Sequence, residues 1–192
     1  MNICVFCGSR LGVRPAYRSA AKALGTELGK RGLGLVYGGA TIGLMGAVAD
    51  AALAAGAPVI GVIPQSIADV EISHTELTEL HVVGSMHERK ALMADRAGAF
   101  VAMPGGIGTL EEIFEVWTWS QLGIHRKPLG FLNVEGYFDS LGHFLDQQVE
   151  EGFVTPAHRE LAFREPEPSI LLDRLLATRI PEVDQGIGPD QR

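Results

Sequence analysis

The sequence predicts an α/β fold, a Rossmann-like, doubly wound and mostly parallel sheet with helices on both faces. Short apolar runs alternate along the chain with longer segments whose apolar residues recur at helical spacing. The apolar runs are nearly continuous, as is typical of strands that are buried on both faces. With 192 residues, 46% of them hydrophobic, the chain can bury a sizeable core as one domain. We place this domain at residues 1–180 and expect a frayed tail over 181–192.

The expected strands are the short apolar runs, and each is bounded by glycine, proline or polar residues. The strands are expected at 2–8, 33–39, 57–64, 79–84, 97–105 and 128–133. Segment 65–78 is polar and acidic, and we interpret it as a loop. The strands are separated by helical patterns, so right-handed crossovers would place them in parallel.

Helices are expected where apolar residues recur every three or four positions. The first, at 16–31, carries Ala20, Leu24 and Leu28 on one face and stops at Gly32, a residue typical of helix C-termini. The other helices are expected at 44–55, 85–96, 109–122, 137–152 and 169–178. Apolar residues of the fifth helix, Phe138, Leu141 and Leu145, could belong to the core or to a dimer interface.

Charge and hydropathy exclude several classes of protein. The net charge is −7, and no basic patch favours nucleic-acid or membrane-surface binding. No stretch approaches the roughly 20 apolar residues that span a bilayer. The first ten residues lack a basic region before their apolar run, so we interpret them as a strand rather than a signal peptide. We therefore expect a cytoplasmic protein.

The two cysteines, Cys4 and Cys7, form a CxxC pattern. At this spacing along a strand their side chains point to opposite faces, whereas redox pairs need a thiolate near a helix start. We therefore expect buried thiols. The six histidines form no metal-type spacing, so no metal site is expected. Trp117 and Trp119 do not share a helix face, so at most one could line a pocket.

The carboxyl ends of the predicted strands contain most of the unusual chemistry. Ligands of doubly wound sheets bind at that edge. Gly105, Gly106 and Gly108 lie where a strand turns into the helix beginning near Thr109. Glycine permits positive φ and close approach of a ligand, and a helix N-terminus attracts anions, so this loop suits a phosphate. A second glycine cluster, at 38–43, opens a neighbouring helix.

Two common phosphate motifs are absent. The chain has no GxxxxGK[ST] sequence, and its GxG at 106–108 is followed by Glu111 where a dinucleotide fingerprint has its third glycine. The second strand ends in two glycines rather than the acid that binds a ribose. NAD is therefore disfavoured, and a nucleotide monophosphate fits better.

Glu112 has two interpretations. Residues 109–112 read Thr-Leu-Glu-Glu, a capping box in which Glu112 would bond the Thr109 amide. Alternatively, the carboxylate serves catalysis. It would repel a phosphate on the adjacent loop, which makes sense if the acid faces another part of the ligand, such as a ribose.

The helix expected at 85–96 begins with a second capping box, Ser85 to Glu88. Arg89 and Lys90 follow in its first turn, where cations oppose the helix dipole. Either they extend to solvent, or they neutralise an anionic substrate or developing negative charge.

Two of these segments resemble the paired motifs of the LOG family, MHxRK and PGGxGTxxE. They are SMHERK (85–90) and PGGIGTLEE (104–112). The similarity extends over about residues 1–160 and includes CGSR (7–10), YGGATIGLMG (37–46), WSQLGIHRKPLGFLN (119–133) and EGFV (151–154). The LOG family contains the cytokinin riboside 5′-monophosphate phosphoribohydrolases and was formerly labelled "possible lysine decarboxylase".

The resemblance implies a Rossmann-like homodimer that cleaves the N-glycosidic bond of N6-modified adenosine monophosphates without metal or organic cofactor. It implies Arg89 and Glu112 as the catalytic pair. The substrate- and phosphate-binding residues that we expect are Gly39, Glu71, Arg89, Lys90, Gly105, Gly106, Ile107, Gly108, Thr109, Leu110, Glu111 and Thr118. Glycosidic cleavage passes through an oxocarbenium-like state that a carboxylate such as Glu112 can stabilise. Arg89 stays charged and would position substrate rather than donate a proton.

Two other functions compete with hydrolysis. A pyridoxal phosphate decarboxylase would need a Schiff-base lysine, and of the four lysines only Lys90 lies close to a plausible site. A nucleotide carrier or sensor of the same fold could bind without hydrolysis, because fold alone does not fix function. Such a module would not need Glu112, so the acid favours the hydrolase.

Overall fold

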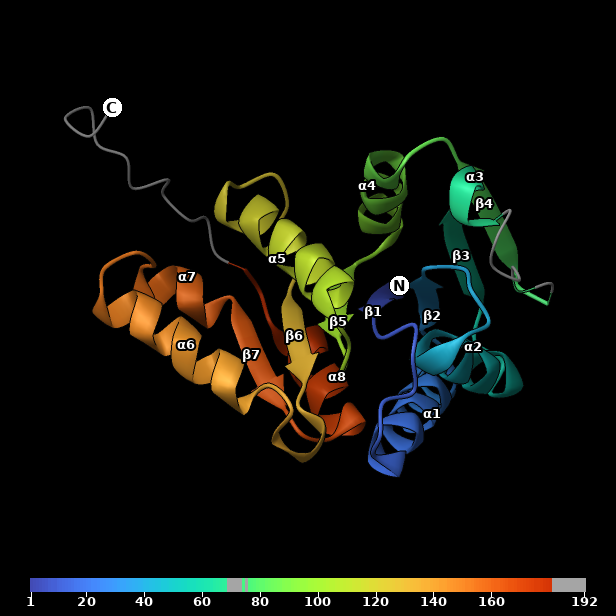
Figure 1. The fold of residues 1–192 in the computed structure, drawn as a ribbon, viewed down its shortest axis with the longest axis horizontal. Helices are drawn as coiled ribbons and strands as arrows, with labels where there is room; N and C mark the ends of the chain where they lie inside the picture. The colour runs from blue at the N-terminus through green and yellow to red at the C-terminus, as the bar shows by residue number, and fades with distance from the viewer. Residues whose placement is uncertain (69–73, 75, 181–192) are drawn as a thin grey trace.

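The computed structural model describes residues 1–68, 74 and 76–180. Its centre is a seven-stranded, all-parallel sheet in the order β4-β3-β2-β1-β5-β6-β7 (Figure 1). This arrangement confirms the predicted doubly wound α/β fold, because the strand order reverses direction beside β1. The strands are β1 Asn2–Phe6, β2 Gly34–Tyr37, β3 Val59–Pro64, β4 Glu79–Val83, β5 Ala99–Ala102, β6 Leu129–Leu132 and β7 Ala162–Glu165.

Helices cover both faces of the sheet. The longer ones are α1 Pro15–Lys30, α2 Gly43–Ala54, α4 Met86–Arg96, α5 Ile107–Gln121, α6 Asp139–Glu150 and α8 Pro168–Ala177, and the shorter ones are α3 Gln65–Ala68, α7 Pro156–Glu160 and the 3₁₀ turn Val134–Gly136. Helices α1, α2 and α8 pack on one face, whereas α4, α5 and α6 pack on the other. None of the helices in these residues is long and apolar enough to cross a membrane.

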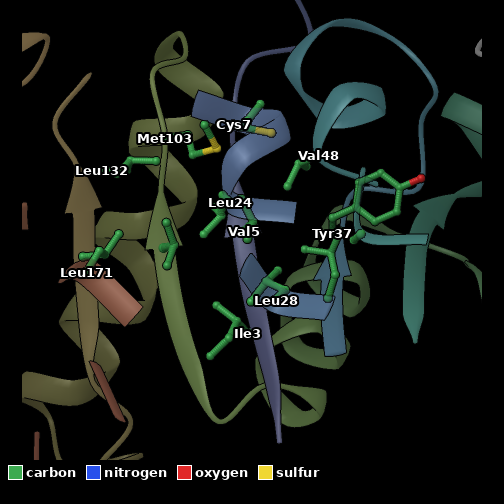
Figure 2. Close-up of a cluster of buried hydrophobic side chains, with 14 of the residues drawn as sticks. Ile3, Val5, Cys7, Leu24, Leu28, Tyr37, Val48, Met103, Leu132 and Leu171 are labelled. Carbon is green, nitrogen blue, oxygen red and sulfur yellow. The ribbon is translucent and has the colours of Figure 1, made fainter. Parts of the chain in front are cut away.

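Strand β1 shows why its sequence reads as a continuous apolar run. Ile3 and Val5 join the core under α1 and α2 (Figure 2), while Cys4 and Phe6 join the core under α4 and α5. A strand buried on both faces has no polar side. Each of these four side chains is at most 2% exposed.

The two cysteines lie on opposite faces of the sheet, as predicted. Cys7 belongs to the first core and Cys4 to the second, and both are free and buried. Burial raises the pKa of each thiol, and the nearby Glu112 carboxylate adds to the effect. Both thiols are therefore protonated at neutral pH, which fits structural cysteines.

The sequence missed β7 and the short helix α7. β7 has only four residues, two of which, Arg164 and Glu165, are charged, so it gives no apolar signal. Helix α3 occupies the first part of the segment that we interpreted as a loop. The predicted tail at 181–192 lies outside the described residues. Phe138 and Leu145 belong to the core and Leu141 packs against it, which decides between the two readings of that helix.

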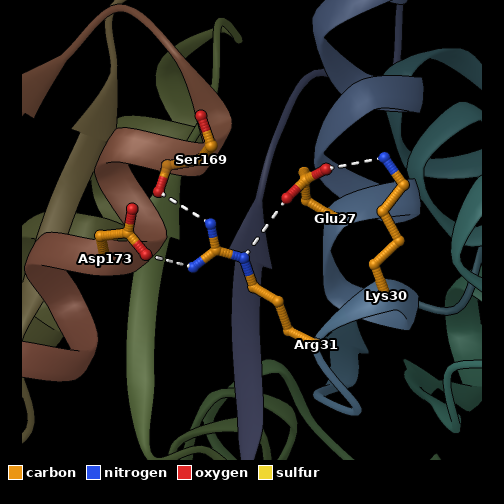
Figure 3. Close-up of polar contacts among 5 residues, drawn as sticks. All are labelled: Glu27, Lys30, Arg31, Ser169 and Asp173. Atoms are coloured by element: carbon orange, nitrogen blue, oxygen red, sulfur yellow. Dashed lines mark hydrogen bonds and ion pairs between the residues drawn. The ribbon is translucent and has the colours of Figure 1, made fainter.

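Arg31 joins the first and last helices of one face (Figure 3). It lies at the C-terminus of α1, where its guanidinium contacts Glu27 at 3.3 Å and, on α8, Asp173 at 2.6 Å and the Ser169 carbonyl at 3.2 Å. The hydrogen bond to Asp173 raises the pKa of Arg31 despite partial burial. The ion pair connects two residues, Arg31 and Asp173, that are 142 positions apart in sequence.

Candidate functional site

A cavity of about 680 Å³ lies at the carboxyl edge of the sheet. Its walls come from the loop after β1 (7–12), the start of α2 (44–45) and the loop that joins β5 to α5 (104–109). Arg89 of α4 and Glu112 of α5 also line it. Both predicted catalytic residues therefore face one cavity at the edge where doubly wound sheets bind ligands.

The loops around the cavity pack backbone against backbone. The Gly8 amide donates to the Pro104 carbonyl at 3.1 Å, and the Leu44 amide donates to the Gly8 carbonyl at 3.0 Å. A Cβ on Gly105 would lie 2.1 Å from Thr109 Oγ1 and 2.9 Å from the Gly8 nitrogen. Only glycine fits there, and the reason is close approach rather than positive φ, which Gly105 does not have.

The N-terminus of α5 opens into the cavity. Gly106 is the N-cap, with no side-chain cap and no acid in the first turn. A Cβ added to Gly106 or Gly108 would meet no atom within 4 Å, so both face open space. The first amides of the helix lack intrahelical partners, and the helix dipole adds positive potential there. This geometry suits an anion such as a phosphate.

The predicted capping box at 109–112 is wrong. Helix α5 begins two residues before Thr109, and the Glu112 carboxylate instead accepts a 2.6 Å hydrogen bond from Arg89. Arg89 also donates to the Val62 carbonyl at 3.0 Å. Arg89 and Glu112 are each only 9% exposed, so neither extends to solvent.

Gly38 makes room for Arg89. A Cβ at this position would lie 2.3 Å from the second terminal nitrogen of the guanidinium. The end of β2 therefore closes the space behind the arginine, while β3 supplies the Val62 carbonyl that it bonds. The side chain is held between two strands and α5, which leaves it little rotamer freedom.

Burial has the largest effect on the pKa of Glu112. Desolvation raises the pKa of this carboxyl, and the charge and hydrogen bond of Arg89 offset that rise only in part. A carboxylate held in such an environment is a stronger base than one in water. Perturbed carboxyls of this kind are enriched at functional sites.

Lys90 is buried, but it does not line the cavity. Its ammonium pairs with Glu111 and Glu115, with Nζ 3.0 Å from the Glu115 carboxylate. Burial lowers the pKa of Lys90, and the bonds from the two glutamates outweigh this effect, so the net pKa is raised. Since Glu111 lines the cavity, Lys90 neutralises an acid beside the α5 N-terminus.

The start of α4 is capped much as predicted. The Ser85 hydroxyl accepts from the Glu88 amide at 3.1 Å. The Glu88 carboxylate accepts from the Gly84 amide at 2.8 Å, one residue before the cap itself. These bonds fix the first turn of α4, which presents Arg89 to the cavity.

Besides Lys90, three of the expected binding residues do not line the cavity. Gly39 faces Ile63 and Leu80, Leu110 lies outside the cavity, and the Thr118 hydroxyl donates back to the Phe114 carbonyl of its own helix. Glu71 lies outside the described residues. The expected residues that do line the cavity are Gly105, Gly106, Ile107, Gly108, Thr109 and Glu111, together with Arg89 and Glu112.

Two further lining residues were not predicted, Arg10 and Tyr137. Arg10 ends the CGSR segment, so its place at a strand end was a usable signal. The Tyr137 hydroxyl donates to the Gly105 carbonyl at 2.6 Å, and its ring meets that of Tyr17 edge-on at 5.5 Å. The turn before Tyr137 contains Glu135 at φ 49°, an uncommon conformation that no sequence pattern predicted.

Solved structures of similar fold share little sequence with this chain. A molybdenum cofactor carrier protein from Chlamydomonas reinhardtii superimposes with a TM-score of 0.70 at 20% identity, covering 92% of this chain and 98% of that one. A molybdenum cofactor binding protein from Rippkaea orientalis gives 0.66 at 22% identity, covering 92% and 97%. These similarities show the fold alone.

Sequence similarity is much closer to plant enzymes. A family model described as "possible lysine decarboxylase" matches residues 45–175. The cytokinin riboside 5′-monophosphate phosphoribohydrolase LOG7 of Arabidopsis thaliana is 50% identical over 96% of this chain and 84% of its own length. The probable enzyme LOGL9 of Oryza sativa is 53% identical over 91% and 77%. The chain therefore belongs to the LOG family, the cytokinin riboside 5′-monophosphate phosphoribohydrolases.

Proposed function

We propose that the protein hydrolyses the N-glycosidic bond of N6-modified adenosine 5′-monophosphates, releasing the free base and ribose 5-phosphate. One observation carries the proposal. The buried Arg89–Glu112 pair and the open, glycine-lined N-terminus of α5 share one cavity of about 680 Å³, a volume typical of small-molecule sites.

The 5′-phosphate binds at the N-terminus of α5 in this proposal. Amides of residues 106–109 donate to its oxygens, and Gly106 and Gly108 leave the space for it. Thr109, only 4% exposed, packs against Gly105 and fixes the loop. Glu112 lies about one helical turn further along α5, so a phosphate on the loop directs the ribose toward its carboxylate.

The reaction follows from this placement. The C1′–N9 bond breaks, its electron pair stays with the base, and positive charge develops on the ribose. The Glu112 carboxylate stabilises that charge and accepts a proton from the water whose oxygen bonds to C1′. The base gains one proton, so the net reaction consumes one water. Arg89 orients Glu112 and keeps it ionised.

A nucleotide carrier or sensor is the second candidate function. It would bind a nucleotide in the same cavity without cleaving it. The cost of burying Glu112 argues against it, since a site that only binds an anionic nucleotide gains nothing from a desolvated carboxylate. A Schiff-base decarboxylase is less well supported, because Lys90 does not line the cavity and its ammonium is paired with Glu111 and Glu115.

The assembly that we propose follows from the family resemblance, and the location from the sequence analysis. We infer a homodimer in the cytoplasm, with the nucleotide monophosphate as the small-molecule partner. Analytical ultracentrifugation tests the first point, since a single species at twice the mass of the 20.5 kDa chain is expected. A monomer at working concentration would contradict it.

The test of function is an assay with the purified protein and no added cofactor. Isopentenyladenosine 5′-monophosphate and AMP are incubated separately, and release of free base is followed by chromatography. We expect isopentenyladenine and ribose 5-phosphate in equal amounts. Tight nucleotide binding by calorimetry with no base released from either substrate would favour the carrier instead.

A further inference from the structure

We propose that Arg10, in the loop after β1, is the cation that binds the 5′-phosphate at the N-terminus of α5. This inference rests on the proposed function for the identity of the ligand. It assigns to Arg10 the phosphate contact that the sequence suggested for Lys90.

The backbone of Arg10 is fixed beside the glycine loop. A Cβ on Gly43 would lie 2.5 Å from the Arg10 nitrogen, so the first residue of α2 rests directly on this segment. A Cβ on Gly8 would lie 3.0 Å from the Arg10 carbonyl oxygen and 3.3 Å from the Gly105 Cα. The Arg10 carbonyl oxygen and the Gly105 Cα therefore both lie beside Gly8, and Arg10 and Gly105 both line the cavity.

The Arg10 side chain also has no hydrogen-bond or ion-pair partner among the described residues. Among the described residues that line the cavity, the lysines and arginines are Arg10 and Arg89. Arg89 already donates from Nε to the Val62 carbonyl and from one terminal nitrogen to Glu112, whose charge it balances. Arg10 forms no hydrogen bond or ion pair with any residue that the structure describes, and its side chain is exposed at the cavity rim.

Among the described residues that line the cavity, Arg10 is the cation that has no carboxylate partner. Arg89 pairs with Glu112, and Lys90 is shared between Glu111 and Glu115, so neither cation is left to meet a further anion. A phosphate monoester carries about two negative charges at neutral pH, more than the partial charge of a helix N-terminus can balance. A guanidinium offers five donors in a planar fork that matches phosphate oxygens, and such charge-assisted bonds are about twice as strong as neutral ones.

The test compares Arg10→Ala and Arg10→Lys with Arg18→Ala. Arg18 is an exposed arginine of α1 with no ion pair among the described residues, and it borders a different groove. Binding of AMP and of adenosine is measured by calorimetry for each variant. We expect Arg10→Ala to weaken AMP binding roughly 10- to 100-fold, with Arg10→Lys in between and Arg18→Ala unchanged. Adenosine binding should not change.

Binding separates this inference from the proposed function. AMP affinity that is unchanged in a folded Arg10→Ala protein, or an equal loss for adenosine, would overturn the assignment of Arg10. So would failure of the wild-type protein to bind AMP. If Arg10→Ala loses AMP affinity but the wild-type protein releases no base, the phosphate contact of Arg10 would be supported and the proposed hydrolase activity would be wrong.

Discussion

Two arginine–carboxylate groups hold distant parts of this chain together, and their electrostatics differ in kind. The Arg31 group joins α1 to α8 near the surface, where Asp173 is 72% exposed (Figure 3). There, hydrogen bonds dominate, and the pKa of Glu27 is lowered by its bond to Lys30 and to a lesser extent by Arg31. At the cavity, burial dominates and the pKa of Glu112 is raised.

The difference separates a group that connects two helices from a group that we propose to be catalytic. Charges near the surface gain a modest interaction and keep much of their hydration. Glu112 loses its hydration, and Arg89 compensates only in part, so the carboxylate is held at a cost to stability. A protein retains such a group when its chemistry is needed.

The largest effect is expected from replacing Arg89 by lysine, with the same replacement of Arg31 as the control. Arg89→Lys keeps the charge, but a lysine cannot reach Glu112 and the Val62 carbonyl with a planar fork. We expect kcat for base release to fall at least about 100-fold, as for loss of a preorganised electrostatic contact. Arg31→Lys should leave kcat unchanged. Equal kinetics in the two variants would show that the two groups do not differ in function.

The two groups should also respond to pH with opposite signs. Because the pKa of Glu112 is raised, the folded state binds its proton more readily, so this group's contribution to stability falls as pH rises from the ordinary glutamate value through the raised one. Glu27 has a lowered pKa, so its contribution is lost as pH falls below the ordinary value.

Activity follows the ionised form of Glu112. We expect kcat/KM to rise about tenfold per pH unit in the acid range and to level off at a midpoint above the ordinary glutamate pKa of about 4.3. The pH profile of base release measures this midpoint. A midpoint below 4 would mean that Arg89, rather than burial, sets the ionisation of Glu112.

A smaller effect is expected at the Tyr137 contact. Tyr137→Phe removes the hydroxyl that donates to the Gly105 carbonyl and so loosens the loop at which we propose that the phosphate binds. We expect KM for the nucleotide to rise about two- to tenfold, which corresponds to one hydrogen bond, with kcat nearly unchanged. Tyr37→Phe is the matched control, because the buried Tyr37 hydroxyl has no partner among the described residues. A similar rise in KM in both variants would contradict a specific role for Tyr137.

The smallest effect is expected at the surface. Asp173→Asn removes the charge that Arg31 meets on α8. Exposed pairs contribute about 0.2–1 kcal/mol, so the free energy of unfolding in urea should fall by no more than this, with kcat and KM unchanged. A loss of several kcal/mol would mean that α8 depends on this single contact for its position.

The sequence was informative where a signal is local. The continuous apolar runs predicted six of the seven strands, and the glycines at 105–108 marked the open N-terminus of α5. Glu112 shows where sequence patterns fail, because Thr-Leu-Glu-Glu matches a capping box but does not lie at the start of the helix. The helix begins at Ile107 after the N-cap Gly106, and the Glu112 carboxylate instead bonds to Arg89, 23 positions away in sequence.

Other misses have the same cause. No residue near Lys90 in sequence predicts its ion pairs, because Lys90 lies on α4 whereas its partners Glu111 and Glu115 lie on α5. Tyr137 reaches Gly105 over 32 positions from a turn whose left-handed Glu135 has no sequence signature. Such contacts depend on how the helices pack on the sheet.

Glu112→Gln gives the most direct test of the account. The amide keeps the shape of the side chain and removes its charge, so AMP binding by calorimetry and single-turnover base release can be measured on the same protein. We predict that AMP still binds within a few-fold of wild type, while base release falls at least 100-fold. Normal base release with a lower Tm would contradict the account and leave the Arg89–Glu112 pair a purely structural contact.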